Sequence, residues 1–278
     1  VSKPHSDLAA KIVPEVIAWL EARGVSTRLD PESAEYAGCA GSIPREEVPT
    51  GAGLVIVLGG DGTLLSAARA IGGRGIPLFA VNLGGLGFLT AITVDELYPQ
   101  LERALDGELR IAHRRMLNCE LWRDGAMLAS YDALNDMVLT KAEIARMIDL
   151  ELQIDGRFVC VYKADGLIVS TPTGSTAYSL SAGGPIMFPT VAALAVTPIC
   201  PHALTQRPVI LDDQSVIQVV NLSDNESTYL TIDGQVGELL KMGDSVVCKR
   251  SRHSIGLVSP PETAFFDVLR EKLKWGGR

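Results

Sequence analysis

The feature that most constrains this chain is an apolar run that ends in a glycine-rich turn. Residues 54–58 read Leu-Val-Ile-Val-Leu, residues 59–63 read Gly-Gly-Asp-Gly-Thr, and apolar residues then recur at helical spacing up to Ile71. A short run of this kind predicts a buried strand, and the spacing after it predicts a helix. Because glycines let an anion approach backbone N–H groups at a helix start, the layout is typical of a phosphate site.

Asp61 places a carboxylate inside this turn. A carboxylate repels phosphate unless a metal ion lies between them or the carboxylate takes up a proton. Asp61 could instead cap the helix, but Thr63 could cap it equally well, so the helix does not require the acid. We therefore interpret Asp61 as catalytic or metal-linked. The turn lacks both the Lys-Ser/Thr ending of a P-loop and the Gly-x-Gly-x-x-Gly spacing of a dinucleotide fingerprint.

Composition sets outer bounds on the fold and on the partners. A chain of 278 residues with 47% hydrophobic content can bury a large core and suits two domains. The net charge of −8 argues against broad binding to nucleic acid or to anionic membranes. Five scattered cysteines indicate reduced thiols in the cytoplasm, and no apolar run reaches the ~18–20 residues that span a bilayer. The first residues, Val-Ser-Lys-Pro, resemble the end of a strand, so we expect the natural N-terminus to be missing.

The first 110 residues alternate between helix and strand. Such alternation predicts a Rossmann-like parallel α/β domain, with both glycine turns (59–63 and 84–88) at the carboxyl ends of strands and hence on one rim. Phe88 lies beside the second turn and suits either the core or a ligand. The expected elements are a helix over 7–23, a strand over 25–29, a loop with one short helix over 31–53, strands over 54–58 and 76–83, and a helix over 95–105.

The middle of the chain changes to strands joined by tight turns. Asp124-Gly125 and Asp155-Gly156 each separate two apolar runs, which is a hairpin signal. We predict an antiparallel, sandwich-like β domain over 111–261, followed by an amphipathic helix over 262–278 that packs back on the α/β domain. The strands are expected at 116–121, 127–134, 148–154, 158–162, 216–222, 229–232 and 245–249, with a turn at 223–226. The helix should place Phe265, Phe266, Leu269 and Leu273 on one face.

Two polar stretches in this region are not explained by strand packing. One is Asn135-Asp136, a pair that by itself is usually a turn. The other runs over residues 164–185, where a strand leads into a turn rich in hydroxyls and glycine and then into a helix. This turn supplies N–H and O–H donors without positive charge. It suits a ribose, a base edge or a bridging phosphate.

Together these stretches resemble the NAD kinase family, which phosphorylates the 2′-hydroxyl of the adenosine ribose of NAD. The turn at 59–63 is weakly specific, since diacylglycerol and sphingosine kinases and phosphofructokinases carry similar turns. The stretch from Ser170 to Tyr178 together with Asn135-Asp136 is specific. The matching positions cover most of the chain: residues 59–63, 82–89, 135–136, 165–166, 171–178, 201–202, 207–208 and 233–235.

The resemblance implies roles for the matching residues. Asp61 matches the catalytic aspartate, Asn135-Asp136 the pair that holds the adenosine portion, and Asp165 the acid that faces the nicotinamide half. The NAD-binding residues implied are Asp61, Gly62, Phe88, Asn135, Asp136, Lys163, Asp165, Thr173, Thr176, Ala177, Tyr178, Ser181 and Gln235, with Asp233 near the site. The donor-phosphate residues implied are Gly59, Gly60, Gly62 and Thr63.

Two positions depart from the commoner family pattern. Many members carry Arg or His where this chain has Gly85, so a direct basic contact with phosphate is impossible at that point. The pair at 135–136 is Asn-Asp, whereas Asn-Glu is commoner. The first difference bears on the choice of phosphoryl donor.

The resemblance also implies the partners. These are NAD with ATP or polyphosphate, Mg²⁺ or another divalent cation carried by the phosphates without metal ligands from the protein, and a homodimer or homotetramer in the cytoplasm. No nucleic-acid or membrane partner is expected. Two other functions stay open: a lipid kinase of the diacylglycerol or sphingosine type, and a non-enzymatic nucleotide sensor that has no need for Asp61.

Overall fold

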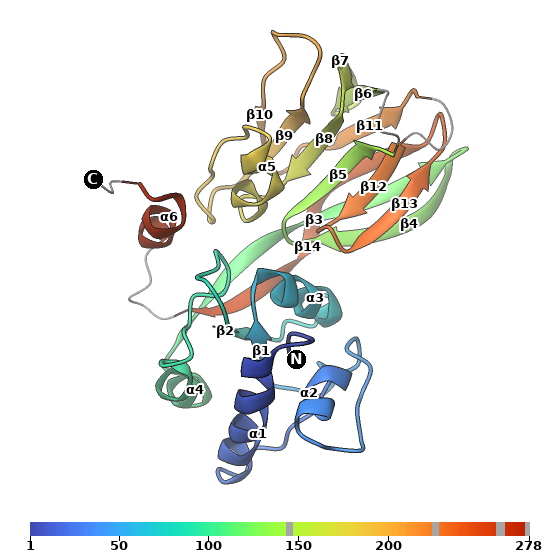
Figure 1. The fold of residues 1–278 in the computed structure, drawn as a ribbon. Coiled ribbons are helices and arrows are strands. Elements are labelled where there is room, and N and C mark those ends of the chain that lie inside the picture. Colours follow the sequence, from blue (N-terminus) through green and yellow to red (C-terminus); the bar gives the residue numbers. More distant parts are fainter. Residues whose placement is uncertain (143–146, 224–227, 260–264, 276–278) are drawn as a thin grey trace. The chain divides into compact units, whose positions relative to one another are not determined.

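The computed structural model describes residues 1–142, 147–223, 228–259 and 265–275. The chain divides into two compact units, one formed by Val1–His113 and Ile255–Arg278 and the other by Arg114–Ser254. The first unit combines helices with parallel strands, and the second is built mainly from antiparallel strands (Figure 1). The predicted fold class, an α/β part plus a β part with a helix near the C-terminus, is confirmed.

Parallel strands form the centre of the first unit. Strand β1 (Val55–Gly59) pairs in parallel with β2 (Leu78–Asn82), and β2 pairs in parallel with β14 (Ser245–Ser259) at Leu257. Every residue of β2 is buried, as expected for a parallel strand covered on both faces. Around them lie α1 (Asp7–Glu21), α2 (Pro31–Tyr36), α3 (Asp61–Ile71), α4 (Leu97–Leu105) and α6 (Phe265–Leu273).

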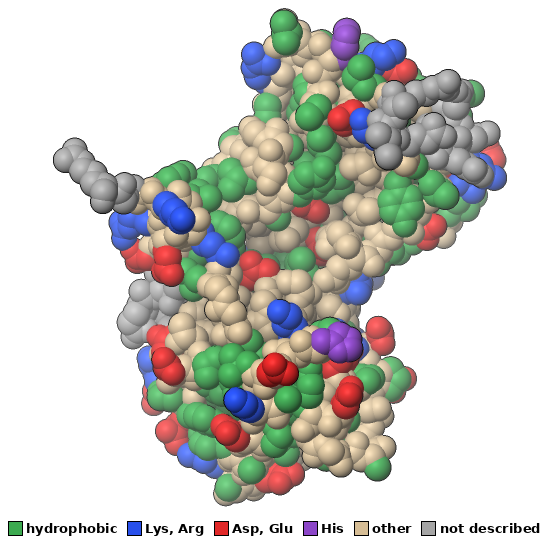
Figure 2. Space-filling model, in the orientation of Figure 1, with side chains coloured by type: hydrophobic (Ala, Val, Ile, Leu, Met, Phe, Trp, Pro, Cys, Tyr) green, Lys and Arg blue, Asp and Glu red, His purple; other side chains and the backbone are tan. Residues whose placement is uncertain are grey.

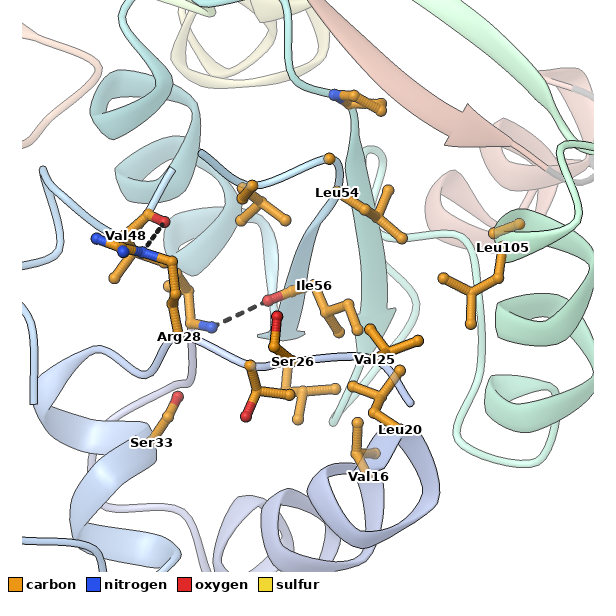
Figure 3. A pocket seen from close by; sticks show the side chains of 18 of the residues that line it. Val16, Leu20, Val25, Ser26, Arg28, Ser33, Val48, Leu54, Ile56 and Leu105 are labelled. Carbon is orange, nitrogen blue, oxygen red and sulfur yellow. Dashed lines mark hydrogen bonds between the residues drawn. The ribbon is translucent and has the colours of Figure 1, made fainter. Parts of the chain in front are cut away.

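The strand predicted over residues 25–29 is wrong, because this segment has no strand beside it. The adjacent edge of β1 is occupied instead by the first residues: the Leu58 N–H donates to the Val1 carbonyl at 2.9 Å, and the Lys3 N–H donates to the Leu58 carbonyl at 2.9 Å. Between residues 25–29 and the start of β1 lies a cavity of about 590 Å³ (Figure 3). A strand needs a backbone partner at hydrogen-bonding distance, and this cavity separates the two segments.

The second unit contains two antiparallel sheets. One has the order β10-β9-β8-β5-β12-β13, and β3 with β4, β6 with β7, β11 and the first part of β14 form the other. Side chains from both sheets, including Met137 and Leu167 from the first and Leu117 and Val219 from the second, form a single buried cluster, as in a sandwich. The strands are β3 (Arg110–Arg123), β4 (Ala126–Ala133), β5 (Asp136–Lys141), β6 (Ile148–Ile154), β7 (Arg157–Ala164), β8 (Gly166–Ser170), β9 (Ala193–Ile199), β10 (Val209–Asp212), β11 (Ile217–Asn221), β12 (Thr228–Ile232) and β13 (Val236–Leu240).

The helix near the C-terminus differs in one respect from its prediction. Val268 and Leu269 are buried, but Phe266, predicted on the apolar face, is 58% exposed. Phe266 contacts the ring of Phe265 edge-on, with the centroids 5.5 Å apart. Most of the turn predicted at 223–226 and the predicted first residues of this helix, 262–264, lie outside the described residues.

Candidate functional site

In the first unit, β1 leads through Gly59 and Gly60 directly into α3. Asp61 is the first residue of that helix, and Gly60 is its N-cap without a capping side chain. Neither Asp61 nor Thr63 therefore acts as the N-cap residue. Gly59 is required by close packing, because a Cβ at this position would overlap the side chain of Thr63. The turn thus presents Asp61 half-buried beside the exposed Gly62.

The Asp61 carboxylate holds the end of the second glycine turn. Its Oδ2 accepts the Phe88 N–H at 2.9 Å. Its Oδ1 accepts the N–H groups of Leu89 at 3.1 Å and Thr90 at 3.2 Å, together with the Thr90 hydroxyl at 3.1 Å. Two turns that are 27 residues apart in the chain are therefore joined through one carboxylate.

Asn82, the last residue of β2, fixes the same turn from its other end. Its side-chain oxygen accepts the Gly84 N–H at 2.7 Å, and its Nδ2 donates to the Gly85 carbonyl and the Thr90 hydroxyl oxygen, each at 2.9 Å. Thr90 in turn donates to Asp61. A Cβ at Gly87 would overlap the Asp61 carboxylate and the Thr90 hydroxyl. The turn and the acid therefore fit together only when residue 87 is glycine.

In the second unit, Asp233 fixes the backbone of the Asn-Asp pair. Its carboxylate accepts the N–H groups of Leu134 at 2.8 Å, Asn135 at 2.7 Å and Asp136 at 3.1 Å. Asp233 lies in the tight turn between β12 and β13 with φ 51°, a left-handed conformation that Asp and Asn tolerate better than most residues. The side chain of Asn135 hydrogen-bonds none of the described residues, which leaves its amide available to a ligand.

The second polar stretch packs directly on this pair. The Thr171 hydroxyl donates to the Leu134 carbonyl at 2.6 Å, and the Thr171 N–H donates to the Asn135 carbonyl at 2.9 Å. A Cβ at Gly174 would overlap backbone atoms of Asn135, so glycine is required there. The two stretches that the sequence singled out independently therefore pack against each other, and we call Asn135-Asp136 together with the turn that follows β8 the polar turn.

Asp136 has an unusual electrostatic environment. It is 4% exposed, and burial raises its pKa to about 7, with the negative charge of Asp233 as the second cause. A carboxyl group that titrates near neutral pH can donate or accept a hydrogen bond under ordinary conditions. Such perturbed groups concentrate at functional sites.

Most of the remaining predicted residues of this unit lie directly after β8, with Gln235 as an exception. Thr173 is buried, Thr176 donates to the Thr173 carbonyl at 3.2 Å, and Ala177 is half-buried. Tyr178 and Ser181 are exposed at the two ends of α5 (Tyr178–Ser181), and Gln235 is exposed within the β12–β13 turn.

Asp165 and Lys163 lie at the opposite end of β8 from this polar turn. The register pairs Asp136 with Ser170 and Thr140 with Gly166, so the length of β8 separates Asp165 from Asp136, roughly 17 Å at the rise of a strand. Asp165 pairs there with Lys141, Nζ to Oδ1 at 2.6 Å, and Lys163 is exposed. This spacing suits the two halves of an extended ligand better than one compact group.

Three residues contact the predicted site residues although the sequence did not mark them as part of the site. Asn82 and Thr90 fix the second glycine turn, and Lys141 pairs with Asp165. Asn82 stands at the end of a predicted buried strand, where a polar residue is a usable signal. Nothing in the pattern around Thr90 or Lys141 marks them.

In Figure 2, Lys and Arg side chains are interspersed with Asp and Glu over the visible described surface. Within residues 1–142, 147–223, 228–259 and 265–275, no three His, Cys, Asp or Glu side chains are placed to hold a metal ion. No helix among these residues is long and apolar enough to cross a membrane.

Comparison with known proteins identifies the family. The model of the ATP-NAD kinase N-terminal domain matches residues 42–109, and that of the ATP-NAD kinase C-terminal domain matches residues 134–259. An NAD kinase of Solibacter usitatus is 62% identical over 278 residues, covering all of this chain and 97% of that protein. One from Geobacter sulfurreducens is 49% identical over 277 residues, covering 98% of that protein.

Solved structures agree with this result. A crystal structure of yeast NADH kinase complexed with NADH superposes with a TM-score of 0.93 at 29% identity, covering 100% of this chain and 87% of that one. An NAD kinase from Archaeoglobus fulgidus in complex with ATP shares the fold, with a TM-score of 0.75 at 24% identity and 94% coverage of both chains. The chain is thus a phosphotransferase. It belongs to the NAD kinase family, enzymes that phosphorylate NAD.

Proposed function

We propose that this chain transfers a phosphoryl group from ATP or polyphosphate to the 2′-hydroxyl of the adenosine ribose of NAD, giving NADP. The observation that carries the proposal is the fixed position of Asp61. Its carboxylate is held by four donors at the junction of two glycine turns, where a helix begins. Phosphoryl transfer depends mainly on positioning and charge neutralisation, and such fixed geometry supplies positioning.

In this proposal Asp61 receives the ribose 2′-hydroxyl. Each oxygen of a carboxylate offers about two acceptor positions. Oδ1 of Asp61 accepts three hydrogen bonds and Oδ2 accepts the one from Phe88, so Oδ2 retains room for a further donor. The 2′-hydroxyl would donate to Oδ2, which aligns the hydroxyl oxygen with the donor phosphorus and accepts the proton. The new P–O bond forms as the bond from that phosphorus to the bridging oxygen of the donor breaks, which releases ADP or the shortened polyphosphate.

The polar turn of the second unit would hold the adenosine. Asn135 offers an unused amide, Asp136 a carboxyl group that titrates near neutral pH, and Thr173 and Thr176 lie in the turn that packs on them. Ala177, Tyr178, Ser181 and Gln235 would add further contacts from this unit, and Phe88 is proposed as an NAD-binding residue of the first unit. Asp165 and Lys163, one strand length away, would face the nicotinamide half, which the extended form of NAD permits.

The donor phosphates would lie on the backbone of residues 59–63. Mg²⁺ bound to these phosphates would neutralise part of the charge that develops during transfer. The four hydrogen bonds that the Asp61 carboxylate already accepts fit an ion that the phosphates carry. The protein would contribute Gly59, Gly60, Gly62 and Thr63 to the phosphates rather than ligands to the metal.

We also propose that the enzyme works as a homodimer or homotetramer in the cytoplasm. The edge strand β7 supports this assembly, since its side chains Phe158, Val159 and Val161 are all exposed. An apolar edge strand tends to be covered by a partner. Light scattering coupled to size-exclusion chromatography should give two or four chains per particle, and a mass of one chain would overturn the proposal.

The function is tested by NADP formation from NAD with Mg²⁺, using ATP and polyphosphate in parallel and an NADP-specific dehydrogenase as readout. Product with either donor is expected, and the ratio of rates assigns the donor. A lipid kinase would phosphorylate diacylglycerol or sphingosine and leave NAD unchanged. A nucleotide sensor would bind NAD without turnover.

A further inference from the structure

The two glycine turns pose an electrostatic problem for a phosphate ligand. Neither residues 59–63 nor residues 84–88 include Lys or Arg, the chain carries a net charge of −8, and Asp61 adds a carboxylate between the turns. The N–H groups of Gly84, Phe88, Leu89 and Thr90 are already donated to side chains of the protein. A polyphosphate here needs a cation that the turns themselves do not supply.

Lys272 of α6 is placed to supply that cation. Its ammonium lies over the ring of Phe88, 5.7 Å from the centroid, and the backbone N–H of Phe88 donates to Asp61. Val268 and Leu269 anchor α6 through buried side chains, while Lys272 is exposed and forms no ion pair with the described residues. Lys272 therefore carries a positive charge, without an ion-pair partner among the described residues, beside the 84–88 turn that the Asp61 carboxylate holds.

The contact with Phe88 is compatible with a mobile ammonium. At nearly 6 Å, it is at the outer limit of a cation–π interaction. The lysine side chain is a flexible four-carbon stem that carries a compact point charge. When a phosphate group enters, this ammonium can leave the ring face and pair with a phosphate oxygen without any movement of the helix.

We propose that Lys272 is a phosphate-binding residue of this enzyme and provides the positive charge that residue 85, a glycine, does not. The ligand is a nucleotide phosphate at the 84–88 turn, either in the phosphoryl donor or in the pyrophosphate of NAD. The assignment rests on the proposed function. Binding experiments test the role of Lys272 and turnover tests the proposed function, so the two proposals can fail separately.

The first experiment compares Lys272→Met, which keeps the apolar stem, with Lys272→Arg, which keeps the charge. Lys274→Met is the matched control, because Lys274 is an exposed lysine two residues further along. Calorimetry measures binding of inorganic tripolyphosphate and, separately, of NAD to each protein without turnover. We expect Lys272→Met to weaken the binding of one of these two ligands by about tenfold, as for one lost charge-assisted contact. Lys272→Arg and Lys274→Met should bind both ligands about as tightly as the wild type.

The ligand affected identifies the phosphate. Weaker tripolyphosphate binding assigns Lys272 to the donor, and weaker NAD binding assigns it to the NAD pyrophosphate. Unchanged binding of both ligands would overturn the proposal and leave Lys272 as a partner of Phe88 alone. A lowered melting temperature with equal loss of both ligands would also overturn it, since that pattern marks a structural role.

A rescue experiment tests the same idea from the other side. A Cβ at Gly85 meets no atom within 4 Å, and the backbone there does not need glycine, so the turn accepts an arginine. In the Lys272→Met background, Gly85→Arg should restore the lost affinity and its dependence on salt. Failure of Gly85→Arg to restore binding in a folded protein would contradict a charge-supplying role. If the wild-type chain binds tripolyphosphate but makes no NADP, the proposed function fails while this site remains.

Discussion

Phe88 donates its backbone N–H to the Asp61 carboxylate at 2.9 Å, and so connects the turn after β2 to the turn after β1. Both turns follow carboxyl ends of parallel strands, where ligands of such sheets bind. A shift in either turn would move both the Asp61 carboxylate and the Phe88 side chain. The distance between Asp61 and any ribose is therefore set by the packing of the second turn as much as by α3.

Replacement of Gly87 by alanine should disable the enzyme, whereas the same change at Gly85 should not. The new Cβ at position 87 would overlap the Asp61 carboxylate and the Thr90 hydroxyl, while at position 85 it enters open space. A displacement of about 1 Å can cost ~10²-fold in rate. Steady-state kinetics should give a kcat for Gly87→Ala lowered by about that factor and a value for Gly85→Ala within about twofold of wild type. Equal activity of the two variants would show that the Asp61 position is not critical.

Asp233→Asn should weaken NAD binding while leaving the affinity for the donor unchanged. Asparagine tolerates the left-handed backbone at φ 51° but has one acceptor oxygen where the carboxylate accepts three N–H groups. A KM for NAD raised about tenfold is expected, as for one charged hydrogen bond lost. Asp124→Asn is the control, since Asp124 occupies a similar hairpin turn with φ 50°. A rise in both Michaelis constants would indicate general disorder instead.

Asp136 should make the unfolding free energy depend on pH. Its pKa is raised to about 7 in the folded chain, chiefly by burial, whereas an unfolded Asp titrates near ~3.9. Between these values the folded state binds the proton and the unfolded state does not. Stability therefore falls as the pH rises through this window, by up to about 4 kcal/mol from this group.

Urea unfolding at pH 4.5, 6 and 8 would measure this dependence. Asp136→Asn cannot ionise, so the wild type should lose stability relative to the variant as the pH increases. If the unfolding free energies of the wild type and of Asp136→Asn changed equally with pH, Asp136 would ionise in the folded state as readily as in the unfolded state.

Much of the fold was predictable because its elements are strongly periodic. The run over 54–58 and the helix after it, the hairpins at Asp124-Gly125 and Asp155-Gly156, and the helix over 7–23 all depend on local patterns that the structure confirms. The strand over 25–29 was wrong because a strand depends on a neighbour, and local sequence does not show that the edge of β1 is taken by residues 1–3. The extension of β14 to Ser259 was missed because polar residues at 251–254 interrupt the apolar pattern.

The sequence marked candidate site residues, but it did not show the contacts between them. The sequence marked Asp61, Asn135 and the 164–185 stretch through unusual composition. It did not show that Asp61 binds the second glycine turn, or that Asp233 binds the backbone of Asn135 and Asp136. Such contacts join residues 27 and about 100 positions apart, so they exist only once the sheets have formed.

The most direct test of the account is the rate of NADP formation by Asp61→Asn, measured beside its affinity for NAD. Asparagine preserves the shape of the side chain but cannot accept the 2′-hydroxyl proton. The account predicts a kcat lowered by ~10²–10⁴-fold, the scale of lost general acid–base assistance, with NAD affinity little changed. Lost NAD binding with unchanged turnover of the bound substrate would contradict the role assigned to Asp61.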